Sequence, residues 1–136
     1  MQNIKLASDY IERSKKRLVA LRTLFEEEAW ADVVREAQEI VELTLKALLR
    51  VSGIEVPRIH DVSDILRQEA SLLPKEVIGK NLETLMEISH SLRRDRELAF
   101  YGSEELTPSS FYRKKDAEDA LNKATNVVEI VAPHIK

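Results

Sequence analysis

The strongest constraint on the fold is the periodic pattern of residues 29–52. Apolar and small side chains recur there at steps of three and four residues, which places them along one side of an α-helix. A stripe of this length has to be buried, so the chain must supply partner helices. Glu42 lies on the flank of the stripe and Lys46 opposite it, and we expect the two to form a solvated pair in the favoured order. The stripe itself consists of Trp30, Val33, Val34, Ala37, Val41, Thr44, Leu45, Leu48 and Val51.

Three more segments repeat this helical period: residues 3–27, 75–99 and 113–133. Between them the chain carries neither an alternating strand pattern nor an internal repeat. Four long helices joined by short connections favour an up-and-down four-helix bundle. The sequence therefore predicts an all-α protein with one additional short helix, organised as a single domain over residues 1–136.

The additional short helix follows from local signals after the second long helix. Gly53 is suited to a left-handed residue at a helix end, and Pro57 stops any continuation. Asp61 is a candidate N-cap for a helix over residues 62–70, and Pro74 opens the next long helix. The short helix and the loop before it should bridge the second long helix and the one over residues 75–99.

Composition limits the functional classes. The chain has 136 residues and a net charge of −3, so no global positive field draws it to phosphate, and any such site must be local. It has no cysteine, which excludes thiolate chemistry, and no run of apolar residues long enough to span a bilayer. We expect a cytoplasmic protein with no membrane association, cofactor or metal site. Its three histidines lie far apart in sequence, and two are expected to be ordinary loop or surface residues: His60, which would help to cap the short helix, and His90.

The densest unusual cluster is SLRRDRELAFYGS, residues 91–103. Guanidinium groups bind phosphate oxygens through paired hydrogen bonds and aromatic rings stack on bases, so this cluster is a candidate site for a nucleotide or single-stranded RNA. Normal helical pitch places Arg96 over the centre of the apolar stripe, where a charged group must be paired or line a groove. Residues 100–112 are expected to form a loop, with further positive charge just after it. The candidate binding residues are Arg93, Arg94, Arg96, Tyr101, Arg113 and Lys114.

Four segments in order resemble HEPN domains, which are small helical modules associated with nucleic acids. AQEIVELTLKALLR resembles the family's second helix, and IHDVSDIL its following short helix. LAFYGS resembles the branch of the family that often accompanies small nucleotidyltransferases, and FYRKKDAEDALNKATNVVEIV is similar to the final helix. The resemblance implies a helical bundle that binds a nucleotide or RNA, with a nucleotidyltransferase partner in a toxin–antitoxin-like system.

The same resemblance bears on catalysis and assembly. HEPN ribonucleases carry an Arg, then four to six residues, then a His, whereas the residue at that spacing from both Arg94 and Arg96 is Tyr101. A tyrosine, with an ordinary pKa of about 10, is a poor general base at neutral pH, so a binding module is favoured over an enzyme. The family also implies a homodimer.

Two alternatives stay open. One is a metal-independent ribonuclease in which Tyr101 or His60 replaces the missing His. The other is a structural interaction module in which Arg96 pairs internally with an acid such as Glu39 or Glu42.

Overall fold

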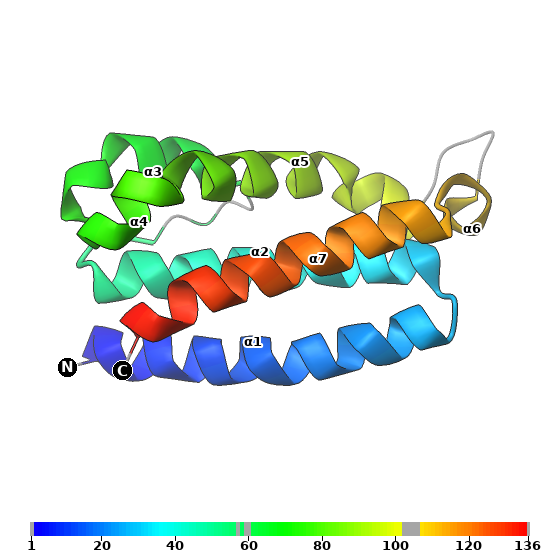
Figure 1. The fold of residues 1–136 in the computed structure, drawn as a ribbon, viewed down its shortest axis with the longest axis horizontal. Helices are drawn as coiled ribbons and strands as arrows, with labels where there is room; N and C mark the ends of the chain where they lie inside the picture. The colour runs from blue at the N-terminus through cyan, green and yellow to red at the C-terminus, as the bar shows by residue number, and fades with distance from the viewer. Residues whose placement is uncertain (1, 57, 59–60, 102–106, 136) are drawn as a thin grey trace.

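The structure of the protein is a computed structural model that describes residues 2–56, 58, 61–101 and 107–135; the side chains of residues 2 and 93–101 lie outside that description. Within the described residues every regular element is a helix, which confirms the predicted all-α class. Four long helices run alternately in opposite directions and form the up-and-down bundle (Figure 1). These are α1 (Gln2–Glu26), α2 (Trp30–Val51), α5 (Leu82–Tyr101) and α7 (Lys114–Val131).

Short elements connect the long helices at the two ends of the bundle. One end holds the predicted short helix α3 (Ser63–Gln68), the 3-10 turn η1 (Ala70–Leu72) and α4 (Lys75–Lys80). The other end holds α6 (Pro108–Phe111), and a 3-10 turn η2 (Ala132–His134) follows α7. Among the described residues, no helix combines the length and apolar character needed to cross a membrane.

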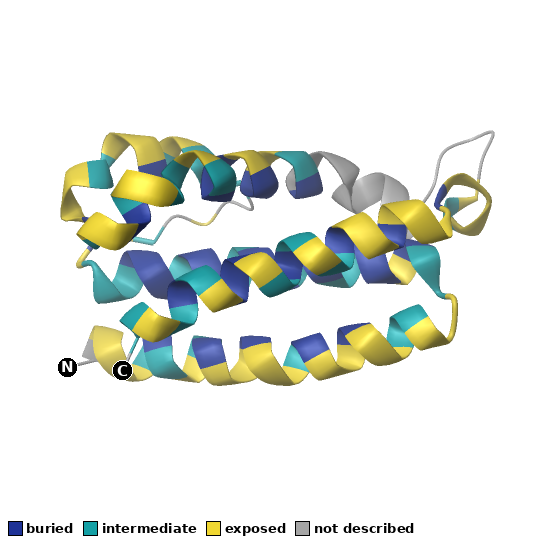
Figure 2. Cartoon of the chain, viewed as in Figure 1, coloured by how far each residue is buried: buried dark blue, intermediate teal, exposed yellow. Residues whose placement is uncertain are grey.

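Helix α2 is the centre of the bundle and packs against α1, α5 and α7. As a result α2 is the more deeply buried helix: Figure 2 shows few exposed positions on α2 and a long exposed face on α1. The α7 face that is buried consists largely of small side chains, which let neighbouring helices approach closely. Its buried residues are Ala117, Ala120, Ala124, Val127, Val128 and Val131.

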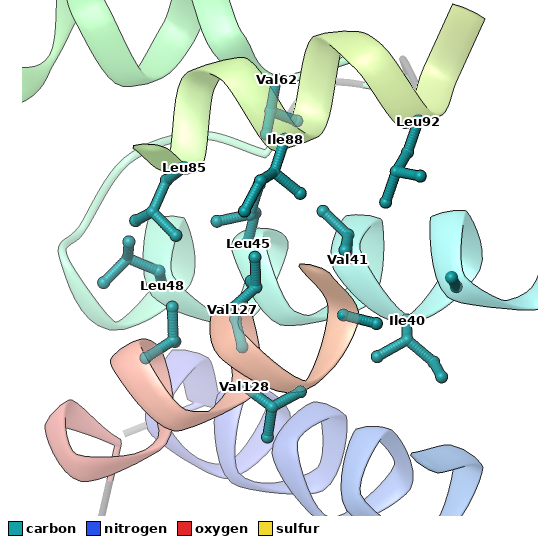
Figure 3. Close-up of a cluster of buried hydrophobic side chains, with 14 of the residues drawn as sticks. Ile40, Val41, Leu45, Leu48, Val62, Leu85, Ile88, Leu92, Val127 and Val128 are labelled. Carbon is teal, nitrogen blue, oxygen red and sulfur yellow. The ribbon is translucent and has the colours of Figure 1, made fainter. Parts of the chain in front are cut away.

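The register between α2 and α5 is antiparallel and can be followed in Figure 3. Leu85, Ile88 and Leu92 of α5 lie in turn beside Leu48, Leu45 and Val41 of α2. All six side chains are buried at 5% exposure or less. Because each step toward the C-terminus of α5 is a step toward the N-terminus of α2, the last third of α5 runs beside the first half of α2.

The turn from α1 to α2 depends on a left-handed residue that is not glycine. Glu28 has φ +59°. Its N–H donates to Phe25 O, and Ala29 N–H donates to Leu24 O, each at 3.0 Å, which closes α1 with a Schellman motif. Across this turn the rings of Phe25 and Trp30 meet edge to face with centroids 5.1 Å apart. The sequence offers no Gly or Pro here, which is why the position of the turn could not be predicted closely.

Helix α2 ends with the same kind of turn, and here the left-handed residue is the predicted glycine, Gly53. Gly53 has φ +76°, its N–H donates to Arg50 O at 3.1 Å, and Ile54 N–H donates to Leu49 O at 2.9 Å. This is again a Schellman motif, here with glycine in the left-handed position. The predicted role of Gly53 is confirmed.

Two boundaries differ from the prediction. The expected single helix over residues 75–99 is divided at Asn81, between α4 and α5, in a stretch where Gly79 and Asn81 both have low helix propensity. The expected loop over residues 100–112 is also shorter, because α5 continues through Tyr101 and Thr107 caps α6 by accepting a hydrogen bond from Ser110 N–H at 3.2 Å. Both errors come from local sequence signals that were too weak to locate a helix end.

Candidate functional site

The residues that the sequence proposed for ligand binding fall at one end of the bundle. Arg93, Arg94 and Arg96 lie in the second half of α5, and Tyr101 is the last residue of that helix rather than part of a loop. Their side chains lie outside the described residues, as does all of His60. In Figure 1 the end of α5 and the start of α7 stand at the same end of the bundle, with α6 beside them. The backbone thus brings the two basic segments to one end.

The start of α7 is organised by a capping interaction. Arg113 occupies the N-cap position, and its N–H donates to Asp116 Oδ2 at 2.9 Å. The first turns of α7 also border a shallow hollow of about 560 Å³ that two lysines share with two acids: it is lined by Lys114, Lys115, Glu118, Asp119 and Asn122. The positive charge of the lysines is therefore partly balanced on the same helix.

A buried amide side chain lies on α2, one turn before Glu42. Gln38 is only 2% exposed. Its Nε2 donates to Glu42 Oε1 at 3.3 Å, while Lys46 Nζ donates to Glu42 Oε2 at 2.9 Å. Gln38 Oε1 has no hydrogen-bond partner among the described residues. Sequence reasoning missed this residue, although a Gln adjoining the apolar stripe was the available signal.

The Glu42–Lys46 pair was expected to be solvated, and that expectation is wrong. The side chains of both residues are only 16% exposed. A groove of about 250 Å³ runs beside them between α1 and α2, and Tyr10, Arg13 and Arg17 of α1 line it together with the pair. The pattern of one helix alone could not show that side chains of α1 would cover this side of α2.

Further along α2, ion pairs join its outer side to α1. Arg17 lies 3.6 Å from Glu36 and 3.9 Å from Glu39, measured between nitrogen and oxygen, and Arg35 lies 4.0 Å from Glu39. Burial raises the pKa of Glu36; Arg17 and Arg35 oppose this and Glu39 adds to it, and the net shift is upward. Glu39, one of the acids considered as an internal partner for Arg96, thus already pairs with two arginines.

A second polar centre, which the sequence did not reveal, connects α3 to α5. Asp61 Oδ1 accepts hydrogen bonds from Ser63 N–H and from the Ser89 hydroxyl, both at 3.0 Å, and Oδ2 lies 2.9 Å from His90 Nδ1. Ser89 Oγ in turn accepts from Val62 N–H at 3.2 Å. The start of α3 is therefore fixed to α5 by one carboxylate and one hydroxyl.

This centre corrects one expectation and extends another. Asp61 is not the N-cap, because α3 begins at Ser63 and Val62 occupies the cap position. His90 is exposed, as predicted, but it has a carboxylate partner that comes from a different element. Burial raises the pKa of Asp61, but the hydrogen bonds from Ser63, His90 and Ser89 outweigh it, so the pKa lies below its ordinary value.

The groove beside this centre has a volume of about 470 Å³, and acids outnumber basic residues in its lining. Its residues are Ser63, Asp64, Arg67, Glu83, Met86, Glu87 and His90, so three acids stand against one arginine and one histidine. Among the described residues, no group of three or more His, Asp or Glu side chains is arranged to hold a metal ion. A surface of this charge does not suit a phosphate ligand.

The comparisons with known proteins identify the family through a family model. The model of the HEPN domain matches residues 7–134. A protein of Methanocaldococcus jannaschii named "Putative toxin MJ1304" is 29% identical, and the match covers 98% of this chain and 91% of that protein.

Two solved structures share the fold. TT1696 from Thermus thermophilus superposes with a TM-score of 0.75 at 23% identity, covering 93% of this chain and 96% of that one. ST0689, described as an archaeal HEPN homologue, gives a TM-score of 0.68 at 23% identity, covering 96% and 98%. At this identity the likeness shows the fold alone. Since the family model extends from the first turns of α1 to the end of η2, the chain belongs to the HEPN domain family.

Proposed function

We propose that this HEPN protein binds RNA or a nucleotide as one component of a toxin–antitoxin-like pair, and that its partner is a nucleotidyltransferase. The observation that carries the proposal is the similarity of nearly the whole chain to the protein named "Putative toxin MJ1304". Because this similarity spans 98% of the chain, it includes α5, where the basic cluster lies.

The chemistry of the α5 segment supports a phosphate-bearing ligand. Three arginines occur within four positions, Arg93, Arg94 and Arg96, and guanidinium groups match phosphate geometry with paired hydrogen bonds. Tyr101 ends the same helix, and a tyrosine ring can stack on a base. Arg113 and Lys114, at the same end of the bundle, supply further positive charge (Figure 1).

A binding role suits the residues better than ribonuclease catalysis. Tyr101 stands where the resemblance to HEPN ribonucleases calls for a His. A phenol with a pKa of about 10 is almost entirely protonated at neutral pH and cannot act as an efficient base. The proposal is therefore retention of RNA without cleavage.

The test is incubation of the protein with labelled single-stranded RNA in EDTA, following retention and cleavage together. We expect salt-sensitive retention of intact RNA, which Arg96→Ala abolishes while circular dichroism shows an unchanged helix content. Arg22→Ala is the matched control, because Arg22 is an exposed arginine on α1 and its removal changes the net charge equally.

Other results would contradict the proposal in different ways. RNA cleavage that disappears in Arg96→Ala would make the protein a metal-independent ribonuclease and Tyr101 the next residue to replace. Absence of retention in the wild type, combined with a lower melting temperature of Arg96→Ala, would identify a structural interaction module. Equal retention by Arg96→Ala and the wild type would remove Arg96 from the site.

Assembly is part of the same proposal. We expect a homodimer in which the C-terminal ends of α5 lie near the two-fold axis, so that two basic segments contribute to one site. Sedimentation velocity at micromolar concentration should then show twice the chain mass of 15.6 kDa. A species of 15.6 kDa would contradict the dimer. Co-elution with a co-expressed nucleotidyltransferase tests the partner.

A further inference from the structure

Phe111 is the one aromatic residue among the large apolar side chains that are exposed in the described part of the chain. The residue is 43% exposed, whereas the other three such residues are aliphatic: Ile4, Val19 and Leu72. Scattered aliphatic side chains are normal on a protein surface, but an aromatic ring leaves a larger apolar area in water. Phe111 also lies at the end of the bundle that carries the basic segments, so its ring is a candidate contact for a ligand (Figure 1).

The ring is held by its neighbours. Tyr112 is 4% exposed, and its ring meets that of Phe111 edge to face, with centroids 4.9 Å apart and an angle of 77° between the planes. In the backbone of α6, Phe111 N–H donates to Thr107 O at 3.2 Å. Helix α6 itself packs against α2 and α5. A ring held in this way loses little freedom when a ligand covers it, so it is preorganised for stacking.

The surroundings of the ring are polar and positive. Residues 107–117 contain three basic residues and one acid, and that acid, Asp116, accepts a hydrogen bond from Arg113 N–H at 2.9 Å. Arg113, Lys114 and Lys115 follow the aromatic pair directly in the chain, and all three are exposed. Figure 2 shows the start of α7 as an exposed segment beside α6. Proteins bind single-stranded nucleic acids by this combination, because bases stack on the ring while cations contact the phosphates.

The isolation of the ring argues against a surface for docking a protein. The exposed aliphatic residues lie on other elements, Ile4 and Val19 on α1 and Leu72 on η1. In the described part of α6 and of the first turn of α7, Phe111 is the only large apolar side chain that is exposed. The core of a protein interface needs several apolar side chains together, whereas one flat base needs a single ring.

We infer that Phe111 stacks on an unpaired base of single-stranded RNA, and that Lys114 and Lys115 contact the adjacent phosphates. This inference rests on the proposed function and adds to it the class of nucleic acid and the residue that holds a base. Stacking uses the face of a base and not its hydrogen-bonding edge, so this contact should accept all four bases.

The experiment combines a binding titration with a cross-link. Binding of labelled single-stranded RNA to the full chain is measured in EDTA over a range of salt concentrations, and stability is measured by thermal unfolding. A second RNA carries 5-iodouridine, which on irradiation cross-links to an aromatic ring that is stacked on it. Mass spectrometry then identifies the cross-linked residue.

We expect Phe111→Leu to weaken RNA binding at least about fivefold, the lower limit for loss of one base–aromatic stack. The slope of log K against log salt should not change, because no charge is lost. Phe111→Trp should retain the affinity of the wild type, since it also presents a flat ring. In the wild type the cross-link should map to Phe111.

Two further variants serve as comparisons. Lys114→Gln should lower the slope of log K against log salt by about 0.7, which corresponds to one lost phosphate contact on a single strand, and should leave the cross-link at Phe111. Leu72→Ala is the matched control, because Leu72 is an apolar residue with 53% exposure on η1, at the other end of the bundle. It should change neither affinity nor slope.

The outcomes separate this inference from the proposed function. Wild-type affinity in Phe111→Leu, while Arg96→Ala still abolishes binding, would overturn the inference alone. No RNA binding by the wild type would overturn the proposed function, and the inference with it. Loss of a co-expressed nucleotidyltransferase from Phe111→Leu with unchanged RNA binding would reveal a protein interface and contradict the inference. If Phe111→Leu fails to fold, the cross-link in the wild type decides, because its absence from Phe111 would overturn the inference.

Discussion

Asp61 Oδ2 lies 2.9 Å from His90 Nδ1, although the two residues are 29 positions apart in the chain. The same carboxylate accepts a hydrogen bond from Ser63 N–H, so a single side chain fixes the start of α3 onto the surface of α5. Because its pKa in the folded protein lies below the ordinary value, the carboxylate makes stability depend on pH.

Replacement of Asp61 by Asn should therefore destabilise the protein at neutral pH but not in acid. The unfolded chain binds the Asp61 proton more readily than the folded chain. The stabilisation is thus complete above the ordinary carboxyl pKa of about 3.9 and is lost as the pH falls through the lower pKa of the folded state. Urea unfolding from about pH 7 to about pH 3 checks this. Asp64→Asn, at an exposed position of α3, is the control. Its difference from the wild type in free energy of unfolding should not shrink in the same way as the pH falls.

Glu28→Gly should stabilise the protein. Glu28 holds φ at +59°, a conformation that is unfavourable for residues with a Cβ and free for glycine. Glycine also has greater entropy in the unfolded chain, which opposes this effect. The net increase in the free energy of unfolding should be about 0.5–1 kcal/mol, or a few degrees in melting temperature. Glu27→Gly, one position earlier, provides the contrast and should not stabilise. A lower melting temperature for Glu28→Gly would contradict the strain argument.

Gly53→Ala should have the opposite effect at the other end of α2. Apart from its two chain neighbours, no atom of the described residues lies within 4 Å of the position that a Cβ would occupy, so the substitution meets no steric obstacle there. Only the backbone conformation at φ +76° opposes the substitution, and the free energy of unfolding should fall by about 1 kcal/mol. Equilibrium unfolding is measured for Gly53→Ala and for Gly79→Ala. Gly79 is helical, so its replacement by alanine should be neutral or stabilising. The comparison separates the cost of the positive φ from the general effect of replacing glycine by alanine.

The buried pair of hydroxyls between α1 and α2 should show strong coupling. Thr44 Oγ1 donates to Ser14 Oγ at 3.0 Å, and both residues are fully buried. Thr44→Val leaves the Ser14 hydroxyl without this partner and should cost about 1–3 kcal/mol. Adding Ser14→Ala should recover part of that loss, which a double-mutant cycle measures. Strictly additive effects would show that the hydroxyls do not depend on each other.

The long helices could be predicted because each carries its own signal. The stripe of α2 and the position of Gly53 are local patterns, and both agree with the structure. The turn at Glu28 and the break at Asn81 could not be located, since the first uses a residue that rarely adopts a left-handed conformation and the second follows from weak propensities. Helix ends without Gly or Pro are set by the packing of the whole bundle.

The polar features were harder to predict than the core. The burial of Glu42 and Lys46 depends on side chains of α1, and the contact between Asp61 and His90 joins elements that only the fold brings together. The roles of Arg96 and Tyr101 remain predictions that rest on sequence and family.

The position of α7 has a consequence for how the protein is made. Helix α7 is the last of the four long helices to be synthesised, yet it packs against the central helix α2 and buries Val127, Val128 and Val131. Until α7 has left the ribosome, one side of α2 is therefore without its native cover, and the bundle closes only after that helix has been made.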